Sequence, residues 1–300
     1  MSTSALPQFS NNDAPANRLS ALRWLMVAIL AAQVPVGIGL YLDAGWATDL
    51  WPLEDVRMTY IFLASIVAST AALIVWPMAR DDPGALRAAA FNLSTATPPL
   101  GLYLLWLSRD GDNRDLIAPG IAFVLFGLAW TVVGRFLRTI PVRDTRQLPK
   151  IVRVVFVGFC VLLIPLGTAL LFQVEDIFPW TISPENSTVA GIIFLSAAGL
   201  FLFILAHPLW IYGEAGFASF LAYDLVLAVP YLDFYRNRND EETVASYYGA
   251  AYAPPAGDNG VGELSLVIYL SVLAISALAA VAFLAWSFWP RPAVAAVPAD

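Results

Sequence analysis

The 300 residues carry a formal net charge of −7, and 59% of them are hydrophobic while 13% are charged. Soluble domains carry about 25% charged residues, so a mean hydropathy of +0.70 excludes an ordinary soluble domain. The negative charge and the lack of a basic block argue against a nucleic-acid partner. A single cysteine, Cys160, excludes an internal disulfide.

Apolar residues occur in runs of about 20, which is the length of a membrane-spanning helix. A helix satisfies its own backbone hydrogen bonds within the bilayer. The predicted fold class is therefore all-α, a polytopic transmembrane helix bundle with the lipid bilayer as its first partner. The predicted spans are residues 24–42, 59–76, 88–107, 116–136, 154–172, 189–210, 217–235 and 264–289.

Asp224 interrupts the apolar run of the span at 217–235, so this segment has two possible placements. With eight spans and a cytoplasmic N-terminus, eleven of the 16 Lys and Arg residues lie inside and five outside, as the positive-inside rule expects. The alternative is seven spans plus an interfacial helix, and it fits the charges equally well. Trp46, Trp51 and Trp180 lie near the predicted outer boundary, where we expect them to anchor the protein at the membrane interface.

Part of the sequence recurs. Residues 60–63 (Tyr-Ile-Phe-Leu) resemble residues 192–195 (Ile-Ile-Phe-Leu), and three further pairs are also 132 positions apart. We infer two four-helix units, and an even number of helices gives both units the same orientation across the membrane, which is a parallel repeat. The recurring pairs are Gly84 and Gly216, Asn92 and Asp224, and Pro98 and Pro230.

The predicted organisation follows from the repeat. Residues 1–17 form a polar, disordered cytoplasmic tail, 18–147 the first unit, 148–290 the second, and 291–300 a C-terminal tail. Residues 236–263 form a long external loop, either disordered or a lid or docking segment. An Arg- and Ala-rich composition with one lysine, Lys150, indicates a bacterial source. We therefore predict the bacterial cytoplasmic (inner) membrane as the location.

Asp224 is the strongest candidate for a functional residue. A carboxylate in the middle of a span costs about 2.5–3.5 kcal/mol and is by default a functional-site hypothesis. We predict a substrate site from Asp224, Tyr223, the repeat partner Asn92 and the nearby Thr95. Pro98 and Pro230 are expected to break their helices and free backbone carbonyls beside this site. The alternative is that Asp224 bonds a neighbouring helix and holds the bundle together.

The single histidine, His207, excludes bis-histidine haem and His-cluster metal sites, and we predict neither a metal nor a cofactor. His207 is a candidate proton relay, with an interfacial residue as the alternative. Glu214, in the turn between two spans, is expected at the water boundary.

These features predict permease-like transport of a small solute through a site between the two repeats. The alternative is a non-catalytic structural or scaffold subunit, with protein partners in a larger membrane complex. A membrane enzyme ranks third, since the sequence has no phosphate-binding Gly-rich loop and no recognisable nucleophile motif.

Overall fold

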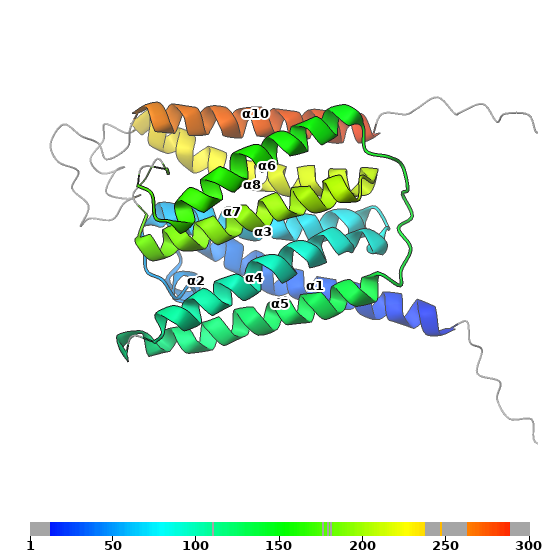
Figure 1. Cartoon of the computed structure of the whole chain (residues 1–300), viewed down its shortest axis with the longest axis horizontal. Coiled ribbons are helices and arrows are strands. Elements are labelled where there is room, and N and C mark those ends of the chain that lie inside the picture. The colour runs from blue at the N-terminus through cyan, green and yellow to red at the C-terminus, as the bar shows by residue number, and fades with distance from the viewer. Residues whose placement is uncertain are drawn as a thin grey trace, which may run out of the picture.

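The computed structural model describes residues 13–109, 111–175, 177–178, 180, 182–237, 247 and 263–288. In this part of the chain, eight long helices lie side by side and successive ones run antiparallel (Figure 1). They are α1 (Asp13–Tyr41), α3 (Arg57–Ala79), α4 (Arg87–Leu107), α5 (Ile117–Leu137), α6 (Lys150–Leu171), α7 (Pro184–Ala206), α8 (Trp210–Asn237) and α10 (Glu263–Phe288). Short helices lie between them at α2 (Gly45–Thr48), η1 (Pro83–Leu86) and η2 (Gly111–Leu116).

The helical fold confirms an all-α, multi-pass integral membrane protein in a lipid bilayer. Within the described residues, seven helices are long and apolar enough to cross a membrane. The uncertain segment 217–235 belongs to one of them, because it forms most of α8 and packs along α3 and α10. Helix α4 is outside this set, since Asn92, two prolines and several hydroxyl residues lower its hydropathy.

α1 begins at Asp13, so part of the predicted N-terminal tail is helical. Residues 1–12, most of the predicted external loop and the C-terminal tail from residue 289 lie outside the described residues. α1 begins and α10 ends at the same end of the bundle, on the right in Figure 1. We call this the termini end, and the other the opposite end.

Four helices form the centre of the bundle and four cover it. α3 packs on α8, and α4 packs on α7. Outside them, α1 packs on α3, α5 on α4, α6 on α7 and α10 on α8. The buried share is 61% for α3, 56% for α7 and 50% for α8, against 17–28% for the spans of α1, α5, α6 and α10. The polar side chains of the inner helices are therefore shielded by an outer layer of apolar helices.

Two helix pairs approach closely at facing glycines. A Cβ atom on Gly101 of α4 would lie 2.5 Å from the carbonyl oxygen of Gly120 of α5. Likewise, a Cβ atom on Gly191 of α7 would lie 2.7 Å from the carbonyl oxygen of Gly167 of α6. Small residues allow this close backbone contact, which packs transmembrane helices tightly.

At the opposite end, the indole groups of two tryptophans form hydrogen bonds that connect the segments before α3 and α7 to the start of the other helix. Trp51 donates to Asn186 Oδ1 at the start of α7, at 3.0 Å, and Trp180 donates to Thr59 Oγ1 at the start of α3, at 3.2 Å. The expectation that Trp180 anchors the protein at the membrane interface was wrong, because its side chain is 3% exposed. Its ring packs inside the bundle, 4.3 Å from the ring of Phe178.

At the termini end, Glu214 is fully buried, so its predicted place at the water boundary was wrong. Arg80 donates to both carboxylate oxygens, at 2.9 and 2.7 Å, and Trp76 and Trp210 also donate to this group. This arginine and these indoles let the acid remain inside the protein.

Asp82 is the second buried acid at the termini end, 132 positions before Glu214. Its Oδ2 accepts the backbone N–H groups of Arg143 and Asp144, each at 2.9 Å. Arg146, in the same connection between α5 and α6, donates a hydrogen bond to the carboxylate of Asp144. Burial of Asp144 raises its pKa, but the hydrogen bonds and the positive charge of Arg146 have the larger combined effect, so the pKa of Asp144 is lowered. The arginine-rich connection between α5 and α6 is therefore fixed to the bundle by hydrogen bonds to Asp82.

Candidate functional site

Asp224 lies in the middle of α8 with its side chain 1% exposed. One carboxylate oxygen, Oδ2, accepts a hydrogen bond from Ser276 Oγ of α10 at 2.6 Å. The other oxygen, Oδ1, is buried without a hydrogen-bond partner in the described part of the chain. No described Arg, Lys or His forms an ion pair with this carboxylate. Asp224 therefore holds α10 against α8 and keeps one acceptor unused.

Asp224 lines a cavity of about 110 Å³, which we call the Asp224 cavity. Tyr223 lies beside it, and its hydroxyl is 3.0 Å from the hydroxyl of Tyr269. Apolar side chains of α6 and α7 complete the wall. The cavity is small and has its polar groups on α3, α8 and α10, namely Ser69, Tyr223, Asp224, Tyr269 and Ser276.

Asn92 of α4 lines a larger cavity of about 350 Å³, which we call the Asn92 cavity. Its side-chain oxygen Oδ1 is also buried without a partner in the described part of the chain. Across the cavity, Gln33 of α1 donates to Thr70 Oγ1 and, at 3.0 Å, to the carbonyl oxygen of Val67. Apolar side chains from six helices form most of the remaining wall, with hydroxyls from Ser69, Thr97 and Ser196.

The two cavities are neighbours in the centre of the bundle. Ile66 and Ser69 of α3, and Ile193 and Ala197 of α7, line both. The hydroxyl of Ser69 also lies 2.7 Å from that of Ser219 on α8, which joins the two inner helices. A thin partition from α3 and α7 therefore separates two compartments, each of which contains one unpartnered side-chain oxygen.

Two of the predicted site residues lie outside both cavities. Thr95 is exposed on α4, and its hydroxyl donates to backbone carbonyl oxygens of its own helix, including that of Phe91 at 2.9 Å. His207 is exposed just after the end of α7, with Nδ1 3.1 Å from the carbonyl oxygen of Phe203. The structure therefore brings Tyr223 and Asp224 together, places Asn92 next to them across the partition, and leaves Thr95 and His207 apart.

The prolines do not break their helices. α4 runs through Pro98 and Pro99, and α8 runs through Pro230, so the expected helix breaks beside the site were wrong. Proline still removes a backbone donor, but the neighbouring helix uses its ring for packing. A Cβ atom on Gly127 of α5 would lie 2.4 Å from Cγ of Pro98.

The sequence interpretation missed three residues of this region. Gln33 carried a usable signal, because a polar amide in an apolar span, like an acid, has a cost that a functional or packing role must offset. Tyr269 and Ser276 are seven positions apart, which places them on one helix face, but nothing in the sequence pairs that face with Asp224. The pairing depends on how α8 and α10 rotate about their axes.

This arrangement suits recognition better than bond-breaking chemistry. Oxygen acceptors and hydroxyl groups bind donors, and the surrounding walls are apolar. Among the described residues, no group of three His, Cys, Asp or Glu side chains could hold a metal ion. The chain matched no protein-family model, no curated protein and no solved structure.

Proposed function

We propose that the protein is a permease-like carrier that moves a small solute through the Asp224 and Asn92 cavities. The observation that carries this proposal is the pair of buried oxygens without partners, Oδ1 of Asp224 and Oδ1 of Asn92. A buried acceptor left unpaired costs about 1–3 kcal/mol. A solute that donates hydrogen bonds to these oxygens removes that cost, so both positions favour a bound donor.

The cavity walls define the class of solute. Apolar side chains surround a few polar groups in each cavity, the usual composition of a small-molecule site. The carboxyl group of Asp224 has no basic partner among the described ion pairs. We therefore propose a small amine or amino alcohol with an apolar body, whose nitrogen is bound by Asp224.

The packing of the helices supports two units of like orientation. α1 packs on α3 as α6 packs on α7, and α4 packs on α5 as α8 packs on α10. Between the units, α3 packs on α8 as α7 packs on α4. This pattern is what a two-fold axis along the membrane normal produces, with α4 counted as an eighth span. The charge distribution favours a cytoplasmic N-terminus in a bacterial inner membrane.

A binding screen followed by uptake tests the carrier proposal. The purified protein is heated with a panel of small amines and amino alcohols, and compounds that raise its melting temperature are tested for uptake into proteoliposomes. We expect Asp224→Asn to abolish both the stabilisation and the uptake. Thr95→Ala is the matched control, because Thr95 is polar and mid-helix but lies outside both cavities.

A second readout asks whether solutes reach the partition. Ser69 lines both cavities, so Ser69→Cys in a Cys160→Ala background places one thiol there. We expect a small, membrane-permeant thiol reagent to label it, and a bound amine to slow the labelling. A thiol that stays unlabelled, or an amine that binds the Asp224→Asn variant as tightly as wild type, contradicts the proposal.

The hydrogen bond from Ser276 to Asp224 supports the alternative of a non-catalytic structural subunit, because it gives Asp224 a role in holding α10 on α8. In that case mild-detergent extraction recovers stoichiometric protein partners. Asp224→Asn then changes only the stability of the protein and leaves the binding of its protein partners unaltered.

A further inference from the structure

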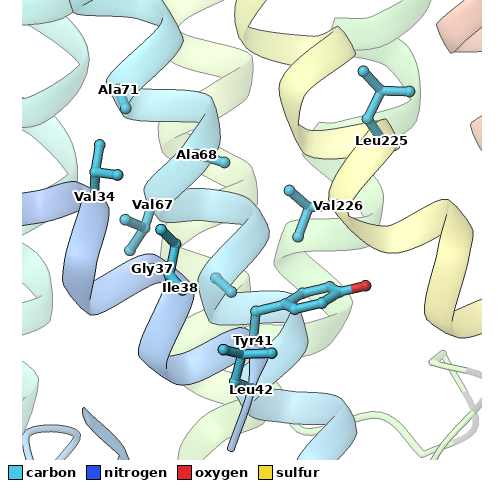
Figure 2. Close-up of a pocket in the computed structure, with 11 residues that line it drawn as sticks. Val34, Gly37, Ile38, Tyr41, Leu42, Val67, Ala68, Ala71, Leu225 and Val226 are labelled. Atoms are coloured by element: carbon cyan, nitrogen blue, oxygen red, sulfur yellow. The ribbon is translucent and has the colours of Figure 1, made fainter. Parts of the chain in front are cut away.

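An apolar groove runs between α1 and α8, with α3 as its floor (Figure 2). Its volume is about 420 Å³, and it opens on the side of the bundle. It shares Val67 with the Asn92 cavity and no lining residue with the Asp224 cavity. The small side chains of Ala68 and Ala71 on α3 make the groove deep, while Ile38 and Leu225 on its two edges are 55% and 58% exposed. None of the described helices fills the space above this strip of α3.

The groove continues into a polar pocket of about 380 Å³ at the opposite end of the bundle. Tyr41 lines both, and in Figure 2 its ring lies at the end of the groove. The polar pocket contains two arginines, Arg57 at the start of α3 and Arg236 near the end of α8, together with Asp233 and Tyr247. The apolar groove thus leads to a pair of guanidinium groups.

The two arginines of this pocket have hydrogen-bonding and ion-pairing groups that no described residue uses. Arg57 Nε is buried and has no hydrogen-bond partner among the described residues, and its guanidinium lies 5.0 Å from the ring centre of Tyr247. Neither arginine forms an ion pair in the described part of the chain. The pocket therefore presents positive charge and at least one N–H donor without a partner.

Asp233, the acid in the pocket, already accepts hydrogen bonds on both carboxylate oxygens. One oxygen of Asp233 accepts from Asn237 at 3.0 Å, and the other accepts from the hydroxyl of Tyr247 at 2.8 Å. Burial, the hydrogen bond with Asp233 and the charge of Asp233 raise the pKa of Tyr247 to about 12, so the phenol keeps its proton and remains a donor. With two arginines facing one occupied carboxylate, the pocket favours an anion.

The dimensions fit one lipid leaflet. Ile61, in the polar pocket, and Ala71, at the far part of the groove, are ten residues apart on α3, or about 15 Å at 1.5 Å per residue. This is half of the hydrocarbon core, which is about 30 Å thick. Arg57 lies one turn beyond Ile61, which brings its guanidinium group to the depth of the lipid headgroups.

We propose that this groove and pocket form a binding site for one anionic phospholipid. An acyl chain lies in the groove between α1 and α8, and the phosphate is bound by Arg57 and Arg236. Guanidinium groups bind phosphate through short charge-assisted hydrogen bonds, which gives the site its preference for an acidic headgroup. Lipid binding here does not require the carrier function proposed above.

Native mass spectrometry of the full-length, delipidated protein tests this site with two probes, phosphatidylglycerol and phosphatidylcholine with identical acyl chains. We expect one phosphatidylglycerol molecule to bind at least about tenfold more tightly than phosphatidylcholine. Arg236→Gln should weaken phosphatidylglycerol binding about tenfold, because one charge-assisted contact is lost. Arg236 is exposed, so this variant is expected to fold normally.

Two further variants separate the chain from the headgroup. Ala68→Phe fills the floor of the groove and should weaken both lipids. Arg109→Gln is the matched control, since Arg109 is exposed at the same end of the bundle but lines neither the groove nor the pocket. Glycerol 3-phosphate, which has the anion without the chains, should not compete. Equal binding of the two lipids, loss of binding in Arg109→Gln, or competition by glycerol 3-phosphate would each overturn the proposal.

Discussion

The Asp224 and Asn92 cavities lie on two sides of one partition, yet their contents differ. The Asp224 cavity has a volume of about 110 Å³ and contains a carboxyl group and two tyrosines, while the Asn92 cavity has about 350 Å³ and contains amides and hydroxyls. Positions 92 and 224, which the proposed repeat would pair, thus carry different side chains, an amide and a carboxyl group. In the proposed carrier, the small cavity would bind the amine of the solute and the large cavity its apolar body.

The largest expected effect concerns the two buried acids at the termini end. Glu214 depends on the side chain of Arg80, whereas Asp82 depends on backbone N–H groups. Arg80→Leu should lower the free energy of unfolding by about 3 kcal/mol, because it removes the bidentate partner of a buried carboxylate and leaves Arg146, 4.0 Å away, as the remaining cation. Reversible unfolding in mixed micelles measures this loss.

Arg143→Leu is the control for that comparison. It keeps the backbone N–H that Asp82 accepts and removes an exposed ion pair with Asp81, so the loss should be below about 1 kcal/mol. Equal losses in the two variants would show that the acids are held in the same way.

Adding a methyl group at either of the two close glycine contacts, between α6 and α7 or between α4 and α5, should have the next largest effect. In Gly191→Ala, the added methyl group meets backbone atoms of α6 at 2.7 Å, and the cost of forcing α6 and α7 apart is about 2 kcal/mol. Gly101→Ala should cost a similar amount between α4 and α5. Thermal unfolding of the purified variants compares the two pairs.

Gly158→Ala is the matched control, because Gly158 lies on α6 and nothing is within 4 Å of the added Cβ atom. This variant should be as stable as wild type or up to about 1 kcal/mol more stable, since alanine favours a helix. A loss in Gly158→Ala equal to that in Gly191→Ala would remove close packing as the explanation.

Ser276→Ala probes the structural contribution of Asp224. Removing the hydroxyl leaves both carboxylate oxygens without partners in the described part of the chain, which should cost about 1–2 kcal/mol. Ser271→Ala on the same helix is the control, because that hydroxyl bonds the carbonyl oxygen of Val267 within its own helix and is exposed. Unfolding curves that coincide for the two variants would show that the bond between α8 and α10 contributes nothing.

The smallest effect is expected for the two indole hydrogen bonds at the opposite end of the bundle, from Trp51 to Asn186 and from Trp180 to Thr59. Trp51→Phe and Trp180→Phe each remove one hydrogen bond and should each cost about 1 kcal/mol. Trp46→Phe is the control, because Trp46 is 56% exposed and should change stability little. Unequal losses, measured by thermal unfolding followed by far-UV circular dichroism, would show that the two contacts are not equivalent.

Helix type and position could be predicted from the sequence because both depend on local composition. The run predicted at 154–172 is found in α6 (Lys150–Leu171), and the run predicted at 116–136 is found in α5 (Ile117–Leu137). The continuity of α4 through its prolines could not be predicted in this way. The ring of Pro98 packs against Gly127 of α5, and α4 continues past it. Local rules miss such compensation by a neighbour.

The amino-acid sequence by itself determined that the protein is an all-helical, multi-pass membrane protein, and it singled out Asp224 as a polar group in an apolar helix. It did so because the length of apolar runs and the cost of burying a charge are local properties. The tertiary structure decided that Ser276 and Tyr269 lie beside Asp224, that Gln33 faces the Asn92 cavity and that Glu214 is buried. These contacts depend on which helices pack together and on their rotation, and long-range packing sets both.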